Sequence, residues 1–404
     1  MNSRQRVMAA IGHQEADRVP IDLNGMRSTG IMAIAYNRLK ACMGLSDGET
    51  KVYDITQQLA EPANAVLERF GVDVLPLPRL PKGLSSVHSR WVPYTLPDNS
   101  QGLIPAELNL EHDSAGWLIR DSDGRILYRM PDGALYFDTV YHPLAQAESI
   151  AEIEAYELPL ISDAELDWLG REAKRVSASG EKAIMGHTGI NLYETAQRLR
   201  GWEQFMLDLG GNQAMAQALM EKLTENALQN LERYLGVVGQ HVDILQMGDD
   251  LGTQNGPQIS PKMYRRLIKP YHQRVFQFAK KTSNKPVFLH CCGSIYPLLP
   301  DLIEAGVDIL NPVQIAAVGM DPASLKRDFG RDLVFWGGGA DTQRVLPFAS
   351  PEEVRAHVQK LIEIFAPGGG YVFCAVHNIQ ADVPPENIMA MYATAQLYGR
   401  YLEH

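Results

Sequence analysis

His290 and Cys292 stand two residues apart at the end of an apolar run, and Gly293 follows directly. In an extended strand, residues i and i+2 point to the same face, so both side chains can reach one point. Imidazole and thiolate are ligands that zinc prefers, and a third ligand would complete a site with one open position. An open position is typical of catalytic zinc sites. The sequence therefore predicts a catalytic metal centre.

Two residues of a later apolar run, Cys374 and His377, are candidates for the third ligand. They lie three residues apart, so a regular strand turns them to opposite faces and only one of them can join the site. We favour Cys374, because a second thiolate suits a zinc ion that must stay bound while its fourth ligand exchanges. His377 is then a candidate catalytic residue.

These ligands need a scaffold that brings several strand ends together. Short apolar runs alternate with amphipathic helical patterns from residue 19 to the C-terminus. Such β-then-α units predict a parallel sheet, and eight of them predict a closed (β/α)₈ TIM barrel. An open doubly wound sheet is disfavoured, because no Gly-x-Gly-x-x-Gly turn follows a strand. The predicted strands are 19–24, 72–77, 182–189, 242–249, 285–293, 307–314, 333–341 and 370–378.

Residues 85–145 break this alternation. They contain three short runs, 116–120, 126–129 and 134–137, which Asp123-Gly124 and Asp132-Gly133 separate. Asp-Gly between such runs is a strong hairpin-turn signal. We predict a small antiparallel meander inserted between barrel strands two and three, beside the mouth of the active site. The whole chain, 1–404, is otherwise predicted to be one barrel domain.

Further polar residues stand at predicted strand ends, where a barrel collects its active-site groups. Asp249 and Asp250 form a carboxylate pair that suits acid–base work, and we assign the catalytic role to Asp249; the alternative is a helix cap. Arg27 suits a clamp on a carboxylate or phosphate, or else a surface ion pair. The predicted substrate-binding residues are Arg27, His187, Tyr193, Asp250, Asn311 and Gln314.

Composition narrows the class of protein. The 404 residues are 45% hydrophobic and 21% charged, with a net charge of −11, which argues against binding to nucleic acid or to an anionic membrane surface. No apolar run approaches the roughly 20 residues of a membrane span, and the N-terminus lacks the apolar core of a signal peptide. Four cysteines are too few for a secreted disulfide framework. We expect a cytoplasmic enzyme.

The chain resembles the uroporphyrinogen decarboxylase superfamily, which includes zinc-dependent methylcobamide methyltransferases. The resemblance runs from Arg4 to the C-terminus, apart from the predicted meander, and implies the same (β/α)₈ barrel. The segments that carry it are Arg18 to Arg27, Leu289 to Gly293 with its continuation Asp308 to Gln314, and His377 to Ile388.

Two branches of this superfamily differ in their motifs. The decarboxylase uses two arginines in Met-Arg-x-x-Gly-Arg and an Asp near the end of the second strand. Here Met26 and Arg27 keep the first part, Ile31 replaces the second arginine, and 74–78 contain no Asp. The methyltransferase branch uses His-x-Cys plus a later Cys as zinc ligands, which His290 and Cys292 match directly.

The resemblance implies a zinc-dependent methyltransferase that works with a corrinoid (cobalamin) carried on a separate protein, since no Asp-x-His-x-x-Gly pattern occurs here. The methyl group would pass between a small molecule, such as a methyl ether, a thiol or a folate, and the corrinoid cobalt; the direction of transfer stays open. One alternative is a metal-free decarboxylase or lyase acting on a small acid. Another is a non-catalytic binder of tetrapyrroles or corrinoid proteins. A homodimer is compatible with the resemblance.

Overall fold

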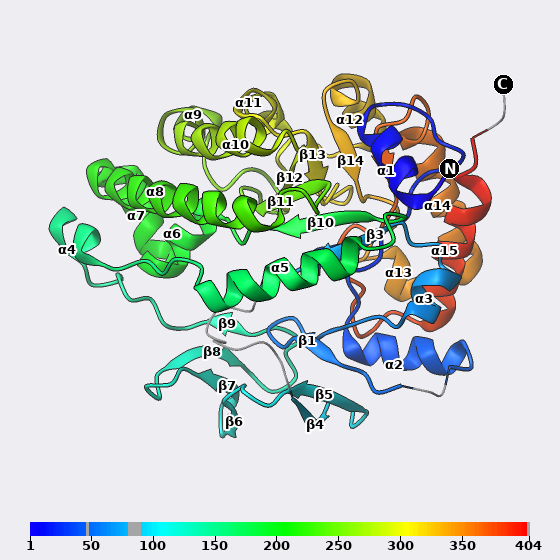
Figure 1. Cartoon of the computed structure of the whole chain (residues 1–404), viewed down its shortest axis with the longest axis horizontal. Coiled ribbons are helices and arrows are strands. Elements are labelled where there is room, and N and C mark those ends of the chain that lie inside the picture. Colours follow the sequence, from blue (N-terminus) through cyan, green and yellow to red (C-terminus); the bar gives the residue numbers. More distant parts are fainter. Residues whose placement is uncertain (46–47, 80–89, 402–404) are drawn as a thin grey trace.

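A curled parallel sheet forms the centre of the computed structural model, which describes residues 1–45, 48–79 and 90–401. Within these residues the sheet has seven strands in the order β15-β14-β13-β12-β11-β10-β3. Helices cover its outer face (Figure 1). Each strand lies inside one of the segments predicted from the sequence. The strands are β3 Val74–Leu77, β10 Ala183–His187, β11 Ile244–Gly248, β12 Val287–His290, β13 Ile309–Asn311, β14 Val334–Trp336 and β15 Tyr371–Val372.

The first predicted strand closes the gap between the two edge strands, although it is too irregular to count as a strand itself. On one side, the amide of Asp22 donates to the carbonyl of Phe373 at 2.8 Å, and the amide of Phe373 donates to Pro20 at 2.8 Å. On the other side, the amide of Asp73 donates to the carbonyl of Ile21 at 2.8 Å. The predicted α/β fold of the TIM-barrel kind is thereby confirmed.

The interior of the barrel is packed with apolar side chains from alternate strand positions, as the two-residue repeat of a strand requires. Phe288 and Trp336 meet edge to face, with ring centroids 5.4 Å apart. Val7 and Ala10 of helix α1 (Ser3–Ile11) belong to the same buried cluster. The interior is therefore a packed, mostly apolar core rather than an open channel.

Helices α1, α4, α5, α9, α12 and α14 begin behind a residue whose side chain caps them. Helix α14 starts at Pro351 behind Ser350, whose hydroxyl accepts from the amide of Glu353 in a capping box, as the motif predicts. The other helices are α2 Ala33–Cys42, α3 Asn64–Arg69, α4 Ile150–Ala155, α5 Asp163–Ser177, α6 Leu192–Arg200, α7 Trp202–Gly211, α8 Gln213–Val238, α9 Pro261–Leu267, α10 Lys269–Ser283, α11 Leu299–Ala305, α12 Pro322–Phe329, α13 Val345–Phe348, α14 Pro351–Phe365 and α15 Pro385–Tyr398, with 3₁₀ turns η1 Arg27–Thr29 and η2 Tyr296–Leu298.

The predicted insertion between the second and third barrel strands consists of two antiparallel sheets, which form a layer of their own below the barrel in Figure 1. Residues 80–89, at its start, lie outside the described residues. One sheet pairs β4 (Trp91–Thr95) with β5 (Gln101–Pro105). The other has the order β6-β7-β8-β9, with bounds Leu110–Asp113, Gly116–Arg120, Ile126–Met130 and Asp138–Thr139. That the chain is one domain stays a prediction.

The run at 134–137, predicted as part of a strand, is irregular instead. Its backbone is tied to the loop between β1 (Val52–Asp54) and β2 (Leu59–Ala60) rather than to a neighbouring strand. The amide of Phe137 donates to the carbonyl of Thr56 at 2.9 Å, and the side-chain amide of Gln58 donates to Leu135 at 2.9 Å. Tertiary contacts therefore override the local strand preference of this run.

Among the described residues, no helix is long and apolar enough to cross a membrane.

Candidate metal centre

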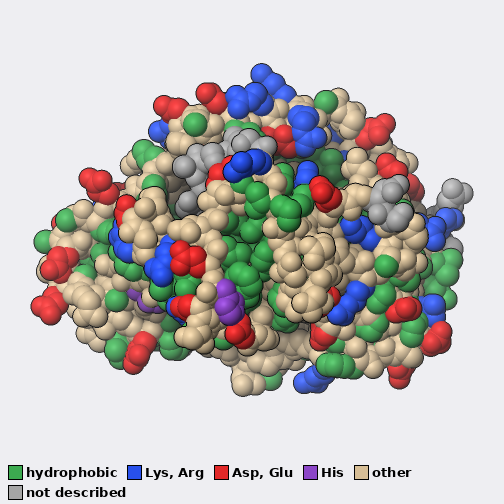
Figure 2. Space-filling view, turned by 90° about the horizontal axis from the view of Figure 1, so that it is seen from below, with side chains coloured by type: hydrophobic (Ala, Val, Ile, Leu, Met, Phe, Trp, Pro, Cys, Tyr) green, Lys and Arg blue, Asp and Glu red, His purple; other side chains and the backbone are tan. Residues whose placement is uncertain are grey.

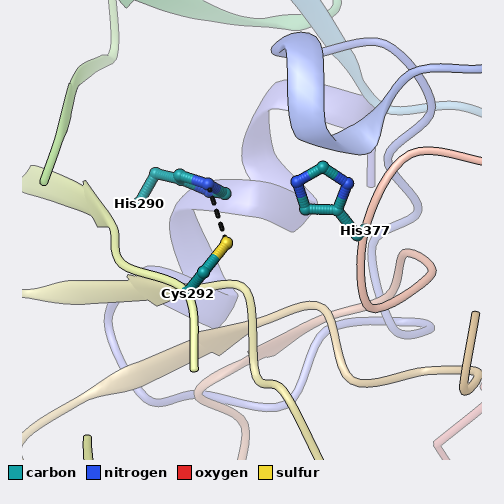
Figure 3. Close-up of side chains that lie close together, drawn as sticks. All are labelled: His290, Cys292 and His377. Carbon is teal, nitrogen blue, oxygen red and sulfur yellow. Dashed lines mark hydrogen bonds between the residues drawn. The ribbon is translucent and has the colours of Figure 1, made fainter. Parts of the chain in front are cut away.

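His290, Cys292 and His377 form a cluster at the carboxyl ends of the barrel strands. One ligand atom of each lies within 4.8 Å of the others, and all three side chains are partly buried. Figure 3 shows the imidazole of His290 and the thiol of Cys292 pointing toward each other, with the ring of His377 facing them from a separate loop. His290 ends β12, Cys292 follows two residues later, and His377 lies beyond β15. The spacing argument from the sequence thus describes the first two correctly.

The donor set and its spacing fit a zinc ion. Nitrogen ligands lie about 2.0–2.1 Å and sulfur ligands about 2.3 Å from zinc, so tetrahedral geometry separates them by roughly 3.5 Å. Nε2 of His290 and Sγ of Cys292 are 3.3 Å apart, and the ring centroids of His290 and His377 are 5.8 Å apart. Three protein ligands leave a fourth position open.

Asn311 orients the ring of His290. Its side-chain nitrogen donates to the carbonyl of Trp336 at 2.8 Å, so its oxygen must face the histidine, 2.7 Å from Nδ1. Nδ1 therefore carries the proton and Nε2 keeps a lone pair directed at Cys292. The hydroxyl of Ser28 adds a bond of 2.9 Å to the same Asn311 oxygen. Such a partner fixes both the tautomer and the orientation of a ligating histidine.

Two side chains hold the turn that carries Cys292. The amide of Cys292 donates to Oδ1 of Asp250 at 2.8 Å, and the amide of Gly293 donates to Oε1 of Gln314 at 2.7 Å. Gly293 adopts φ +92°, and a β-carbon there would lie 2.5 Å from the backbone of Gly252. Only glycine fits this turn without displacing that backbone.

His377 is held in a low-polarity setting. Burial, aided by the nearby ring of His290, lowers the pKa of its imidazole to about 4, although Asn378 acts in the opposite sense. The neutral imidazole, which is the form that binds a metal, is therefore favoured. Burial also raises the pKa of the Cys292 thiol well above its usual value, with Asp250 adding to the effect.

Cys374, which the sequence argument favoured over His377 as third ligand, lies elsewhere. Its side chain is 0% exposed and belongs to the apolar barrel interior with Val372 and Trp336. Both residues lie beyond β15, and they face different places: Cys374 the barrel interior and His377 the pair His290 and Cys292. We therefore replace Cys374 by His377 in the proposed ligand set. His377 no longer serves as a separate catalytic residue.

Asp249, the predicted acid–base residue, is a buried anchor. Its carboxylate, 2% exposed, accepts the amides of Tyr193 and Glu194 at 2.9 Å each and Nε2–H of His272 at 2.8 Å. The two amides belong to the first turn of α6, so the alternative of a helix cap describes it better. The capped helix precedes Asp249 in the chain. Tyr193 is 0% exposed and packs against Phe205, so it does not line the site.

Asp250 brings a carboxyl group beside the ligands, and Glu194 brings a second one within electrostatic range of it. Oδ1 of Asp250 lies 3.7 Å from Nε2 of His290, and its side chain is 35% exposed. Burial and then the charge of Asp250 raise the pKa of Glu194 above its usual value. Glu194 was missed in the sequence, where it reads as an ordinary acidic residue in the first turn of α6.

Arg27 and His187 lie at the mouth, in different roles. Nη1 of Arg27 donates to Oδ2 of Asp54 at 3.0 Å, while its side chain is 55% exposed. Nε2–H of His187 donates to the carbonyl of Gly25 at 2.8 Å, and burial lowers the pKa of His187 to about 4. His187 therefore supports the loop that bears Arg27. Of the predicted substrate-binding residues, Arg27 and Asp250 keep exposed polar atoms, whereas Asn311 and Gln314 orient other groups.

Figure 2 shows the face on the side of the insertion. Hydrophobic side chains gather toward its middle, with a histidine and side chains of both charges around them.

Residues 143–398 match the family described as Uroporphyrinogen decarboxylase (URO-D). This match spans more than half of the chain. The chain belongs to the URO-D family. The matched residues include three of the segments that carry the resemblance, 289–293, 308–314 and 377–388.

Individual relatives in the URO-D family are distant. The uroporphyrinogen decarboxylase of Thermus thermophilus is 30% identical over 187 residues, which are 44% of this chain and 47% of that protein. The chain thus matches about half of the length of this relative. The uroporphyrinogen decarboxylase of a Nostoc species is 24% identical over 294 residues, which are 66% of this chain and 79% of that protein.

A solved structure, a methyltransferase from Methanosarcina mazei, is similar over nearly its whole length. It has a TM-score of 0.61 and 16% identity, and the superposition covers 98% of this chain and 99% of that one. At this identity the similarity establishes the fold alone.

Proposed function

We propose that this member of the URO-D family is a zinc-dependent methyltransferase that acts with a corrinoid protein. The observation that carries the proposal is the convergence of His290, Cys292 and His377, whose ligand atoms lie within 4.8 Å of one another. Nitrogen and sulfur donors in this arrangement are typical of zinc, and two of them come from a His-x-Cys motif.

The surrounding residues suit a reacting heteroatom at the open position. A zinc ion there would supply Lewis acidity to the oxygen, sulfur or nitrogen that bears or receives the methyl group. Asn311 keeps Nε2 of His290 unprotonated, and the adjacent carboxyl groups of Asp250 and Glu194 can hold or accept a proton next to that heteroatom. Exposed Arg27 at the mouth can orient an anionic part of a substrate.

The same geometry disfavours porphyrinogen decarboxylation. Ile31 stands at the position of the family's second substrate-binding arginine, and its side chain is 0% exposed in the core. The remaining arginine, Arg27, is paired with Asp54 at 3.0 Å. A substrate rich in carboxylates would meet a single guanidinium, near the carboxyl groups of Asp250 and Glu194.

Methyl transfer with free cobalamin as the probe tests the proposal in both directions. Zinc-loaded protein is incubated with cob(I)alamin and 2-methoxyphenol, and separately with methylcobalamin and 2-mercaptoethanol, while the cobalamin spectrum is followed. We expect a zinc-dependent spectral change in one of the two directions. Cys292→Ala should abolish it, and Cys291→Ala is the matched control, because Cys291 points away into the core.

Transfer that proceeds equally without zinc, or that survives Cys292→Ala, would contradict the proposed role of the cluster. Metal-independent release of carbon dioxide from small carboxylic acids would favour the decarboxylase alternative instead.

A further inference from the structure

The link between β8 and β9 brings one side chain of the insertion, Tyr136, to the loop of His377. Its hydroxyl donates to Oδ1 of Asn378 at 2.9 Å and accepts from the side-chain amide of Gln380. Residues 136 and 378 are separated by 242 positions in the chain. No local sequence signal predicts this contact.

The backbone on both sides of Tyr136 is fixed. The carbonyl of Leu135 accepts from Gln58, and the amide of Phe137 donates to Thr56, each at 2.9 Å. Phe137 itself is 7% exposed and belongs to the main core cluster. The hydroxyl of Tyr136 is therefore presented from an immobilised segment rather than from a freely moving tip.

Asn378, the partner of that hydroxyl, stands between the insertion and the metal ligand. Its side chain is 0% exposed, and it directly follows His377 in the chain. Its Oδ1 also accepts from Gln380 at 2.7 Å, and its Nδ2 donates to Gln57 at 3.0 Å.

His377 needs such support, because it lies in an irregular segment beyond the two-residue strand β15. Backbone bonds hold the chain on either side of it, from the amide of Val376 to Ala340 at 3.0 Å and from the amide of Ile379 to Gly30 at 2.9 Å. The side chains of Asn378 and Gln380 hold the same segment from the side of the insertion.

We infer that Tyr136 is a positioning residue for the metal centre, through which the insertion fixes Asn378 and Gln380 and thereby the loop that carries His377. The inference rests on the proposed function, since it assumes that His377 is a ligand. It assigns the antiparallel insertion a part in building the site, in addition to any part in covering it.

Zinc affinity of the full chain, measured by competition with a chromophoric chelator, tests the inference without an activity assay. Tyr136→Phe should bind zinc about tenfold more weakly. This is the low end of the roughly 10- to 100-fold loss of affinity that follows removal of a residue supporting a metal ligand, because Gln380 still donates to Asn378. Tyr141→Phe is the matched control: its hydroxyl accepts from Arg125 at 3.1 Å in the same insertion, and its zinc affinity should equal that of wild type.

A second readout reports the ligand geometry directly. Cobalt(II) is loaded in place of zinc, and its visible d–d bands should change in Tyr136→Phe and stay unchanged in Tyr141→Phe. Gln380→Leu, which cuts the same network from its other side, should weaken zinc binding in the same direction and serves if Tyr136→Phe does not fold.

Equal zinc affinity and equal cobalt spectra for wild type and Tyr136→Phe would overturn this inference and leave the metal centre standing. Absence of zinc binding by the wild-type chain would overturn the metal centre and this inference with it.

Discussion

Replacing Asn311 by leucine tests whether the metal centre depends on an oriented His290. Leucine has nearly the shape of asparagine but offers no acceptor to Nδ1–H, which now lies 2.7 Å from the Asn311 oxygen. The ring would lose its fixed tautomer as well as its orientation. We expect zinc affinity to fall 10- to 100-fold, which corresponds to about 1.4–2.7 kcal/mol.

The same substitution also costs stability, so a matched control is needed. Asn387 is 1% exposed, and its Nδ2 donates to the carbonyls of Leu346 and Ala349 at 2.9 and 2.8 Å. Asn311→Leu and Asn387→Leu each leave buried polar groups unpaired, at about 1–3 kcal/mol per group. Both should lower the unfolding midpoint, whereas only Asn311→Leu should weaken zinc binding.

The assay is chelator competition on folded protein, with circular dichroism to verify the fold of each variant. Zinc affinity of Asn311→Leu within a factor of two of wild type would refute the argument that this side chain orients His290. An equal loss in Asn387→Leu would show that the effect follows from general destabilisation.

Three further outcomes follow from the buried and exposed groups. Asp249→Asn should lower the free energy of unfolding by about 1–3 kcal/mol, because it weakens the hydrogen bonds that tie α6 and His272 to residue 249. The zinc stoichiometry should stay that of wild type. A loss of zinc with an unchanged denaturant midpoint would contradict the anchoring role. Arg27→Ala should change stability by less than about 1 kcal/mol, since the Arg27 side chain is 55% exposed and solvent screens its ion pair with Asp54. A larger change in a urea titration would be inconsistent with that exposure. Burial lowers the pKa of His187 to about 4, so between about pH 4 and 6.5 the unfolded chain binds more protons than the folded chain. The contribution of His187 to stability is therefore complete above pH 6.5 and is lost as the pH falls. The stability advantage of wild type over His187→Asn should shrink by up to about 3 kcal/mol across that window, and a difference that does not change with pH would be the contrary result.

Much of the scaffold was predictable because its signals are local. Each of the seven barrel strands lies within a segment predicted from the sequence. The pair His290 and Cys292 was equally accessible, since the two-residue repeat of a strand places both side chains on one face. Such arguments need no knowledge of distant parts of the chain.

The choice between Cys374 and His377 was not accessible in that way. Beyond β15 the chain leaves regular strand geometry, so alternation along the sequence no longer says which residue faces the pair. Asp249 was misassigned for a related reason: its partners, the amides of Tyr193 and Glu194, come from a helix 55 residues earlier or more. Tyr136 likewise acquires its place only through tertiary contacts of the insertion.

Metal content of the purified protein tests the central claim most directly. Elemental analysis is carried out on wild type and on Cys292→Ala, His377→Ala and Cys374→Ala, each supplied with zinc and then freed of unbound metal. The account predicts about one zinc per chain in wild type and in Cys374→Ala, and its loss in Cys292→Ala and His377→Ala. Zinc that is retained in His377→Ala and lost in Cys374→Ala would contradict the ligand set, and a wild-type chain without zinc would contradict the metal centre itself.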